Sequence, residues 1–198
     1  MLTTTTAALK EWAVAVEALE CGKTIMLLRK GGISEQGGRF QVAQKTVLLY
    51  PTYEHQQPFL LKSESAEQVT PVTSGWHPEN VRIGSFATVT DIYPVTDENI
   101  VNALLPFHIW NEQFISDRLK WKPRQPLYIL LLRAYKLAQA QIIPYNSAYG
   151  GCKSWIDITQ PITINQSTPV LHDPTYNQIV AEIRGIVRNS RNSYVTSL

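Results

Sequence analysis

The sequence predicts one α+β domain, a small, mostly antiparallel β-barrel with flanking helices and a C-terminal extension. Three observations lead to this prediction. Residues 7–20 carry apolar side chains at helical spacing, residues 25–28 form an apolar run without alternation, and shorter apolar runs recur between Gly, Pro and polar connections. A chain of 198 residues is long enough to bury a core without disulfides or metals.

The first helix is predicted over residues 7–20, with Thr6 as its N-cap and Gly22 in the left-handed position after its end. A strand follows over residues 24–29. Its apolar run shows no alternation, so both faces are expected to be covered, and we place it at the centre of the barrel. It leaves through the glycines at 31 and 32.

Later elements follow from similar signals. Strands are predicted over 45–50, ending at Pro51, and as a pair over 81–83 and 87–93 around Gly84, and a long strand over 127–134. Helices are expected within 97–118, broken at Pro106, and over 174–188. The expected division is a barrel domain at 7–144, an extension packed on it at 145–188, with a short strand at 154–158, and a flexible tail at 189–198.

Composition sets limits on the function. The net charge of +2 is too small to indicate a polyanionic partner by itself, so such a case depends on local clustering. Only Cys21 and Cys152 occur, which is typical of a reducing compartment. With no signal-peptide pattern and no apolar run near the ~20 residues of a membrane span, we expect a cytoplasmic protein without membrane contact. The oligomeric state stays open.

Four stretches carry a family resemblance: residues 10–14 (KEWAV), 27–33 (LLRKGGI), 49–55 (LYPTYEH) and 149–155 (YGGCKSW). Together they resemble a bacterial family, common in cyanobacteria, that is known as domain of unknown function 1802. The resemblance spans about residues 9–173. It implies no activity, because the family has none assigned.

A more distant resemblance is one of pattern. A helix ending in Gly-Lys-Thr, a strand ending in Arg29, a Leu-Tyr-Pro-Thr strand and residues 83–89 (IGSFATV) resemble the opening of ASCH and PUA-like barrels. That superfamily is largely RNA-binding and includes small amidohydrolases acting on modified nucleosides. The resemblance therefore implies RNA as a partner.

The clearest charge cluster lies between Asp117 and Asp157, where no acidic residue occurs. Cations fix a sugar-phosphate backbone and aromatic faces stack on unpaired bases, and tryptophans and tyrosines are interleaved with these cations. The same pattern would arise if the cations only face solvent at the rim of the barrel and about half of the aromatic residues belong to the core. The basic turn at Arg29 and Lys30, at the end of the first strand, could also hold a phosphate. The predicted nucleic-acid-binding residues are therefore Arg29, Lys30, Arg118, Lys120, Trp121, Lys122, Arg124 and Lys153. Because Pro123 restricts the residue before it, we expect Lys122 to be extended and Trp121 to be exposed.

A second candidate is a ligand loop. Tyr53, Glu54 and His55 follow a strand end, where functional loops often lie, and Cys152 lies beside Lys153, which favours a thiolate. A packed polar loop explains the same residues. The four histidines are scattered, so no metal site and no cofactor are expected.

The leading hypothesis is a nucleic-acid-binding module, RNA before DNA. The first rival is an enzyme acting on a modified nucleobase or a phosphodiester. Lys23 and Thr24 resemble the amidohydrolase pair in only one of two registers, and no Asp or Glu has a Lys two positions later, as a common nuclease motif requires. A protein-interaction module is the second rival. No catalytic residue is assigned.

Overall fold

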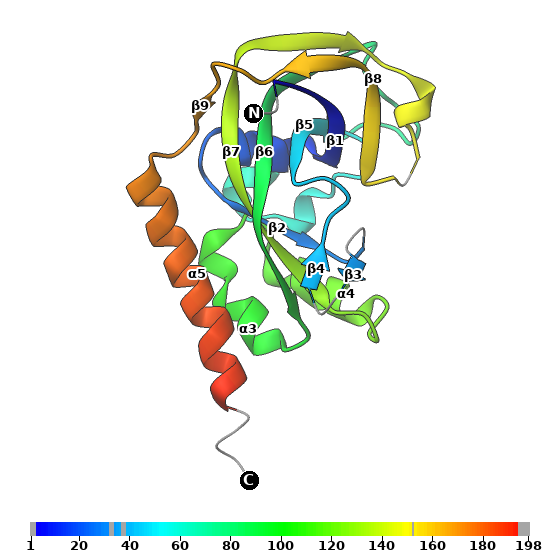
Figure 1. Ribbon diagram of the computed structural model, residues 1–198. Helices are drawn as coiled ribbons and strands as arrows, with labels where there is room; N and C mark the ends of the chain where they lie inside the picture. Colours follow the sequence, from blue (N-terminus) through cyan, green and yellow to red (C-terminus); the bar gives the residue numbers. More distant parts are fainter. Residues whose placement is uncertain (1–2, 32–33, 37–38, 152, 194–198) are drawn as a thin grey trace.

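The computed structural model describes residues 3–31, 34–36, 39–151 and 153–193, and within them a seven-stranded sheet with helices around it (Figure 1). The strand order is β2-β7-β6-β5-β1-β8, and β9 pairs with β7. These strands are β1 (Thr4–Trp12), β2 (Met26–Arg29), β5 (Thr46–Thr52), β6 (Asn80–Val95), β7 (Leu127–Pro144), β8 (Trp155–Thr163) and β9 (Thr168–Pro169). A separate hairpin consists of β3 (Ser34–Gln36) and β4 (Arg39–Gln41).

Along the described part of the sequence, four helices lie between strands and the fifth follows the last strand. They are α1 (Ala13–Glu20), α2 (Ser63–Ala66), α3 (Glu98–Ala103), α4 (Glu112–Lys120) and α5 (Asp173–Ser193), with short 3₁₀ turns η1 (Pro58–Leu60), η2 (Leu105–Phe107) and η3 (Ser147–Tyr149). Among these described helices, none is long and apolar enough to cross a membrane.

The mixed α+β class is confirmed, but the closed barrel is wrong. The sheet is open, because the four-residue β2 pairs only with β7 and β8 pairs only with β1 in the described chain. It is also partly parallel, since β1 runs alongside β5 in the same direction, while the other pairs are antiparallel. Strand β2 therefore lies at an edge of the sheet and not at its centre.

The predicted helix at 7–20 is wrong in its first half. Residues up to Trp12 form β1, so Thr6 is within a strand and is no N-cap. The physical reason is long-range pairing, because β1 has a partner on both sides and satisfies its backbone groups there. The end of α1 is as predicted: Gly22 has φ +72°, its N–H donates to Leu19 O at 3.3 Å, and Lys23 N–H donates to Ala18 O at 2.9 Å.

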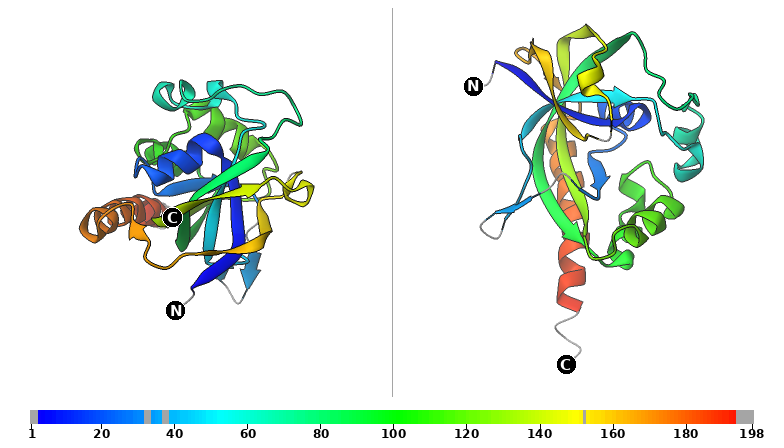
Figure 2. Two further views of the ribbon diagram at one scale, coloured as in Figure 1. Left: turned by 90° about the horizontal axis from the view of Figure 1, so that it is seen from above. Right: turned by 90° about the vertical axis from the view of Figure 1, so that its right-hand side faces the viewer.

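Strand lengths also differ from the predictions. The expected pair at 81–83 and 87–93 is one strand, β6, whose register shifts between Ile83 and Ser85 at Gly84. Pro51 lies within β5 and does not end it. Strand β7 continues ten residues beyond the predicted end to Pro144, because residues up to Pro144 pair with the beginning of β6. Figure 2 shows β6 and β7 as a long, curved pair.

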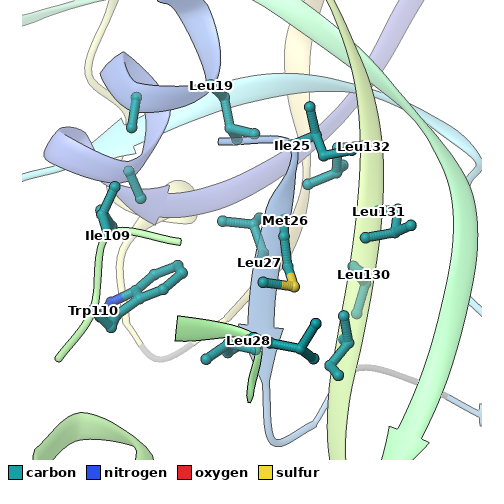
Figure 3. Close-up of a cluster of buried hydrophobic side chains, with 14 of the residues drawn as sticks. Leu19, Ile25, Met26, Leu27, Leu28, Ile109, Trp110, Leu130, Leu131 and Leu132 are labelled. Atoms are coloured by element: carbon teal, nitrogen blue, oxygen red, sulfur yellow. The ribbon is translucent and has the colours of Figure 1, made fainter. Parts of the chain in front are cut away.

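Two clusters of buried side chains hold the sheet in place. The larger one joins β2 and β7 to α1 and to Trp110 (Figure 3) and extends to α5 through its buried face, which includes Tyr176 and Ile183. The smaller one lies around Leu48, Ile83 and Ile156. The C-terminal part thus adds β8 to the sheet and α5 to the core. The division at residue 144 stays a prediction, and the tail beyond 193 lies outside the described residues.

Candidate functional site

A cleft of about 760 Å³ lies where the carboxyl ends of β1, β2 and β5 come together. Its other walls are residues 75–78, helix α4 with the two residues after it, and the segment around η3. The volume is within the range of ligand pockets.

Positive charge is concentrated in this cleft. Among the described residues, two carboxylates line it, those of Glu11 and Glu54, against six cations: Lys10, Arg29, Lys30, Arg118, Lys122 and Lys153. The excess of four positive charges exceeds the net charge of +2 of the whole chain. The rest of the protein therefore carries a net negative charge, and a near-neutral protein presents one basic concavity.

The floor of the cleft is closed by an ion pair between strands that do not pair in the sheet. Arg29 at the end of β2 has its Nη1 2.5 Å from Glu11 Oε2 at the end of β1, and both side chains are largely buried. The same nitrogen donates to Lys10 O at 3.4 Å, and Glu11 Oε1 accepts from Trp12 N–H at 2.9 Å. Curvature of the sheet thus brings the ends of β1 and β2 together.

Lys30 comes next in the chain and is only 6% exposed. Its Nζ donates to Leu119 O in α4 at 3.5 Å, a long hydrogen bond. Burial lowers the pKa of Lys30 below its usual range. An ammonium in such surroundings favours an anion beside it.

On the α4 wall, Arg118 lies over two aromatic rings. Its guanidinium carbon is 4.9 Å from the centre of the Phe114 ring and 5.8 Å from that of Trp121. Burial is the main cause that lowers the pKa of Arg118, with the charge of Arg29 acting in the same direction. Trp121 is 48% exposed, and Lys122 Nζ is 4.6 Å from the centre of its ring. Cation–π contacts hold this wall.

A second aromatic wall comes from the residues after β5 and before β6. Trp76, 44% exposed, packs edge-on against Tyr53 with ring centres 5.8 Å apart. The His77 ring stacks on Tyr145 at 3.4 Å with 11° between the planes. Aromatic rings therefore line more than one side of the cleft.

Glu54 and His55 form a pair at this wall. His55 Nε2 lies 3.4 Å from Glu54 Oε1. The same oxygen accepts from Gly75 N–H at 2.6 Å and from Ser74 Oγ at 3.2 Å. The Gly75 hydrogen bond is the main cause that lowers the pKa of Glu54. A fixed carboxylate next to an exposed imidazole has the arrangement that orients a histidine for proton transfer.

The third wall is tied to β1 by Lys10. Its Nζ donates to Tyr149 O at 2.5 Å and to Gly151 O at 2.9 Å. These bonds fix the segment that carries Lys153 into the cleft lining.

Two buried polar atoms of the cleft lining have no hydrogen-bond partner among the described residues, Tyr50 Oη and Trp110 Nε1. Tyr50 is 3% exposed, and burial, followed by three neighbouring tyrosines, raises its pKa to about 12. An unsatisfied buried hydroxyl costs about 1–3 kcal/mol, so its presence beside a cleft needs an explanation beyond stability.

The structure brings most of the predicted site residues together. Nine of them line this cleft: Arg29, Lys30, Tyr53, Glu54, His55, Arg118, Trp121, Lys122 and Lys153. Lys120 and Arg124 are exposed and do not line it. Cys152 lies outside the described residues. The roles of all these residues stay predictions.

Two local predictions near α4 had different outcomes. The exposure of Trp121 is as expected. The extended conformation of Lys122 is wrong, because its φ is +49°; the turn is closed by a 2.9 Å hydrogen bond from Gln125 N–H to Lys122 O, which outweighs the restriction from Pro123.

Sequence reasoning missed several lining residues: Lys10, Glu11, Tyr50, Trp76, His77 and Trp110. The helix predicted over 7–20 includes Lys10 and Glu11, whereas the structure has them at the end of a strand. Both belong to the stretch at 10–14 that carries the family resemblance, which was the available signal. In the parts of the chain that the structure describes, no group of three or more His, Cys, Asp or Glu side chains is placed to hold a metal ion.

Comparison with known proteins identifies the family. The family model described as "Domain of unknown function (DUF1802)" matches residues 8–182, so the chain belongs to this family, as its sequence motifs predict. No curated protein matches it significantly.

Among solved structures, the chain is similar to ASCH from Zymomonas mobilis, with 15% identity and a TM-score of 0.45 over 88% of this chain and 93% of that chain. A point mutant of the same protein gives 14% identity and a TM-score of 0.40, over 91% of this chain and 98% of that chain.

Proposed function

We propose that the cleft binds single-stranded nucleic acid, with RNA as the first candidate. The observation that carries the proposal is that the basic excess and the exposed aromatic side chains lie in the same concavity. Phosphates are contacted by cations, and unpaired bases stack on aromatic faces whatever their sequence. The resemblance of the sequence to the largely RNA-binding ASCH and PUA-like group favours RNA over DNA.

Single strands fit this cleft better than a duplex. Trp121 and Trp76 can stack only on bases whose faces are free, and these are buried inside a duplex. The cations line a concave surface and not an exposed stripe, so they suit a backbone that enters the cleft. Affinity is therefore expected to decrease from single-stranded RNA to duplex of the same sequence.

The test is a binding titration with a fluorescent oligonucleotide, followed by anisotropy. Single-stranded RNA, single-stranded DNA and duplex RNA are compared at about 50 and about 200 mM salt, because the phosphate contribution falls steeply across this range. Saturable binding of single strands, weakened by salt, supports the proposal. The absence of binding at the lower salt concentration refutes it.

An enzyme acting on a phosphodiester or a modified nucleobase is the second candidate, and the Glu54–His55 pair favours it. His55 is exposed in the cleft, and Glu54 is fixed by Gly75 and Ser74 at distances that hold it beside the imidazole. Incubation of labelled single-stranded RNA with the protein and with H55A tests this function. Product formation by the parent but not by H55A supports it, whereas intact RNA in both refutes it for this substrate.

A further inference from the structure

The cations of the cleft differ in how they are paired, and Lys30 is the most unusual. Only 6% of its surface is exposed, yet it has no carboxylate partner among the described residues. An ammonium offers three donors, and only one weak acceptor, Leu119 O at 3.5 Å, is present. A buried charge is expected to be paired, and no described side chain supplies a carboxylate counter-ion for Lys30.

Arg118 stands next to Leu119 on the same helix and is also without a carboxylate ion pair in the described chain. Its neighbours are the aromatic rings of Phe114 and Trp121 and, at longer range, Glu11 and Arg29. Arg29 is already paired with Glu11. The inner cleft therefore holds three cations and one carboxylate, an excess of two positive charges.

We infer that this inner cleft, formed by Lys30, Arg118 and the Arg29–Glu11 pair, binds a terminal phosphate monoester of a nucleic-acid strand, so that the protein recognises strand ends. The inference rests on the proposed function. A phosphate monoester carries about −1.5 to −2 charges at pH 7 and three acceptor oxygens, which matches the excess of two. An internal phosphodiester carries one charge and matches it only in part.

Geometry supports the same ligand. Arginine presents a planar fork suited to two phosphate oxygens, and lysine acts as a point charge, so Arg118 and Lys30 together can satisfy the three oxygens of a monoester. The neighbouring Trp121, half exposed at the rim, is placed to stack on the first base. The 5′ and 3′ monoesters share this chemistry, and the experiment distinguishes them.

The experiment compares three single-stranded RNAs of identical sequence and internal label: one with a 5′-phosphate, one with a 3′-phosphate and one with hydroxyls at both ends. We expect the parent protein to bind one phosphorylated form about 10- to 100-fold more tightly than the hydroxyl form, as for charge-assisted hydrogen bonds. K30M is expected to lose this preference, so that its affinities for the phosphorylated and hydroxyl forms agree within about threefold.

The matched control is K120M, the same substitution at an exposed lysine that does not line the cleft; it should retain the full preference. K30M is expected to fold, since an apolar side chain replaces a buried charge, and thermal unfolding checks this. R118Q provides the second variant and should also lose the preference.

The outcomes separate this inference from the proposed function. Equal binding of all three RNAs by the parent would overturn end recognition and leave the proposed function intact. A preference that survives in both K30M and R118Q would overturn the assignment of these residues. Failure of every RNA to bind would overturn both.

Discussion

Replacing Trp121 by alanine should weaken binding of single-stranded RNA while leaving the fold intact. Stacking of a base on an aromatic side chain contributes about 1–3 kcal/mol. The loss therefore corresponds to an increase of about 5- to 150-fold in Kd. Because stacking carries no charge, the dependence of log Kd on log salt should not change, and the anisotropy titration at several salt concentrations measures both quantities.

The effect on stability follows from exposure. Trp→Ala at a fully buried position costs about 3–5 kcal/mol, but Trp121 is 48% exposed, so about half of this, roughly 2 kcal/mol, is expected. For a protein of this size, this lowers Tm by about 4–8 °C. Binding is measured well below that temperature, so the folded fraction does not limit it.

The matched control is F59A. Phe59 is another exposed aromatic residue, 68% exposed, and it does not line the cleft. Its replacement should leave Kd unchanged. If W121A binds as tightly as the parent, or if F59A weakens binding as much as W121A does, Trp121 does not stack on a base and the aromatic part of the argument is refuted.

Four further predictions concern charge, acid, an unpaired hydroxyl and a turn. K122Q should reduce the salt slope of RNA binding by roughly 0.7, as for one phosphate contact on a single strand, whereas K120Q, outside the cleft, should not. Burial lowers the pKa of His108 to about 3, so below about pH 6.5 only the unfolded state gains a proton there. The free energy of unfolding should therefore fall by up to about 1.4 kcal/mol per pH unit on acidification. Urea unfolding at pH 7 and 5.5 measures this decrease, and H108F should abolish it. Y50F should keep or raise Tm, because the hydroxyl has no partner among the described residues, yet it should weaken RNA binding about 2- to 10-fold if the ligand uses Oη. G22A should lower the free energy of unfolding by about 1–3 kcal/mol, because φ is +72° and a Cβ would lie 2.7 Å from Leu171 Cδ2.

Local signals predicted the parts of the fold that depend on local geometry. The left-handed glycine at 22 follows from helix-end chemistry, and the helices within 97–118 follow from periodicity with Pro106 as a break. The failures depend on long-range partners. Leu9 and Trp12 stand three residues apart, which is helical spacing, but the pairing of β1 with β5 and β8 decides their conformation.

Barrel closure failed for a related reason. Whether a sheet closes depends on the meeting of its two edge strands, and no window of the sequence contains both β2 and β8. In the described chain no ladder joins β2 to β8. The ends of β2 and β1 are joined through side chains, in the Arg29–Glu11 pair.

The site divides in the same way. The run of cations near α4 is visible in the sequence, but which of them line the cleft is not, because this depends on where the helix ends and the turn begins. Lys120 and Lys122 are two residues apart and equally charged, yet only Lys122 lines the cleft. Trp76 has no local mark in the sequence, and Glu11 has only its place in the stretch at 10–14 that carries the family resemblance. The folded chain places Trp76 beside Tyr53 and Glu11 beside Arg29.

Backbone conformation gives a further argument for the same cleft that does not depend on charge. In the described chain, the non-glycine residues with positive φ are His55, Lys122 and Gln166, at +66°, +49° and +57°. Each costs of order 1 kcal/mol, and such residues persist where the surroundings hold them, often at functional sites. Two of the three line the cleft. The Lys122 conformation is held by the hydrogen bond that its carbonyl accepts from Gln125 N–H. Positive φ and cleft lining thus coincide in two exposed residues that belong to separate walls, as expected of a site that binds a ligand.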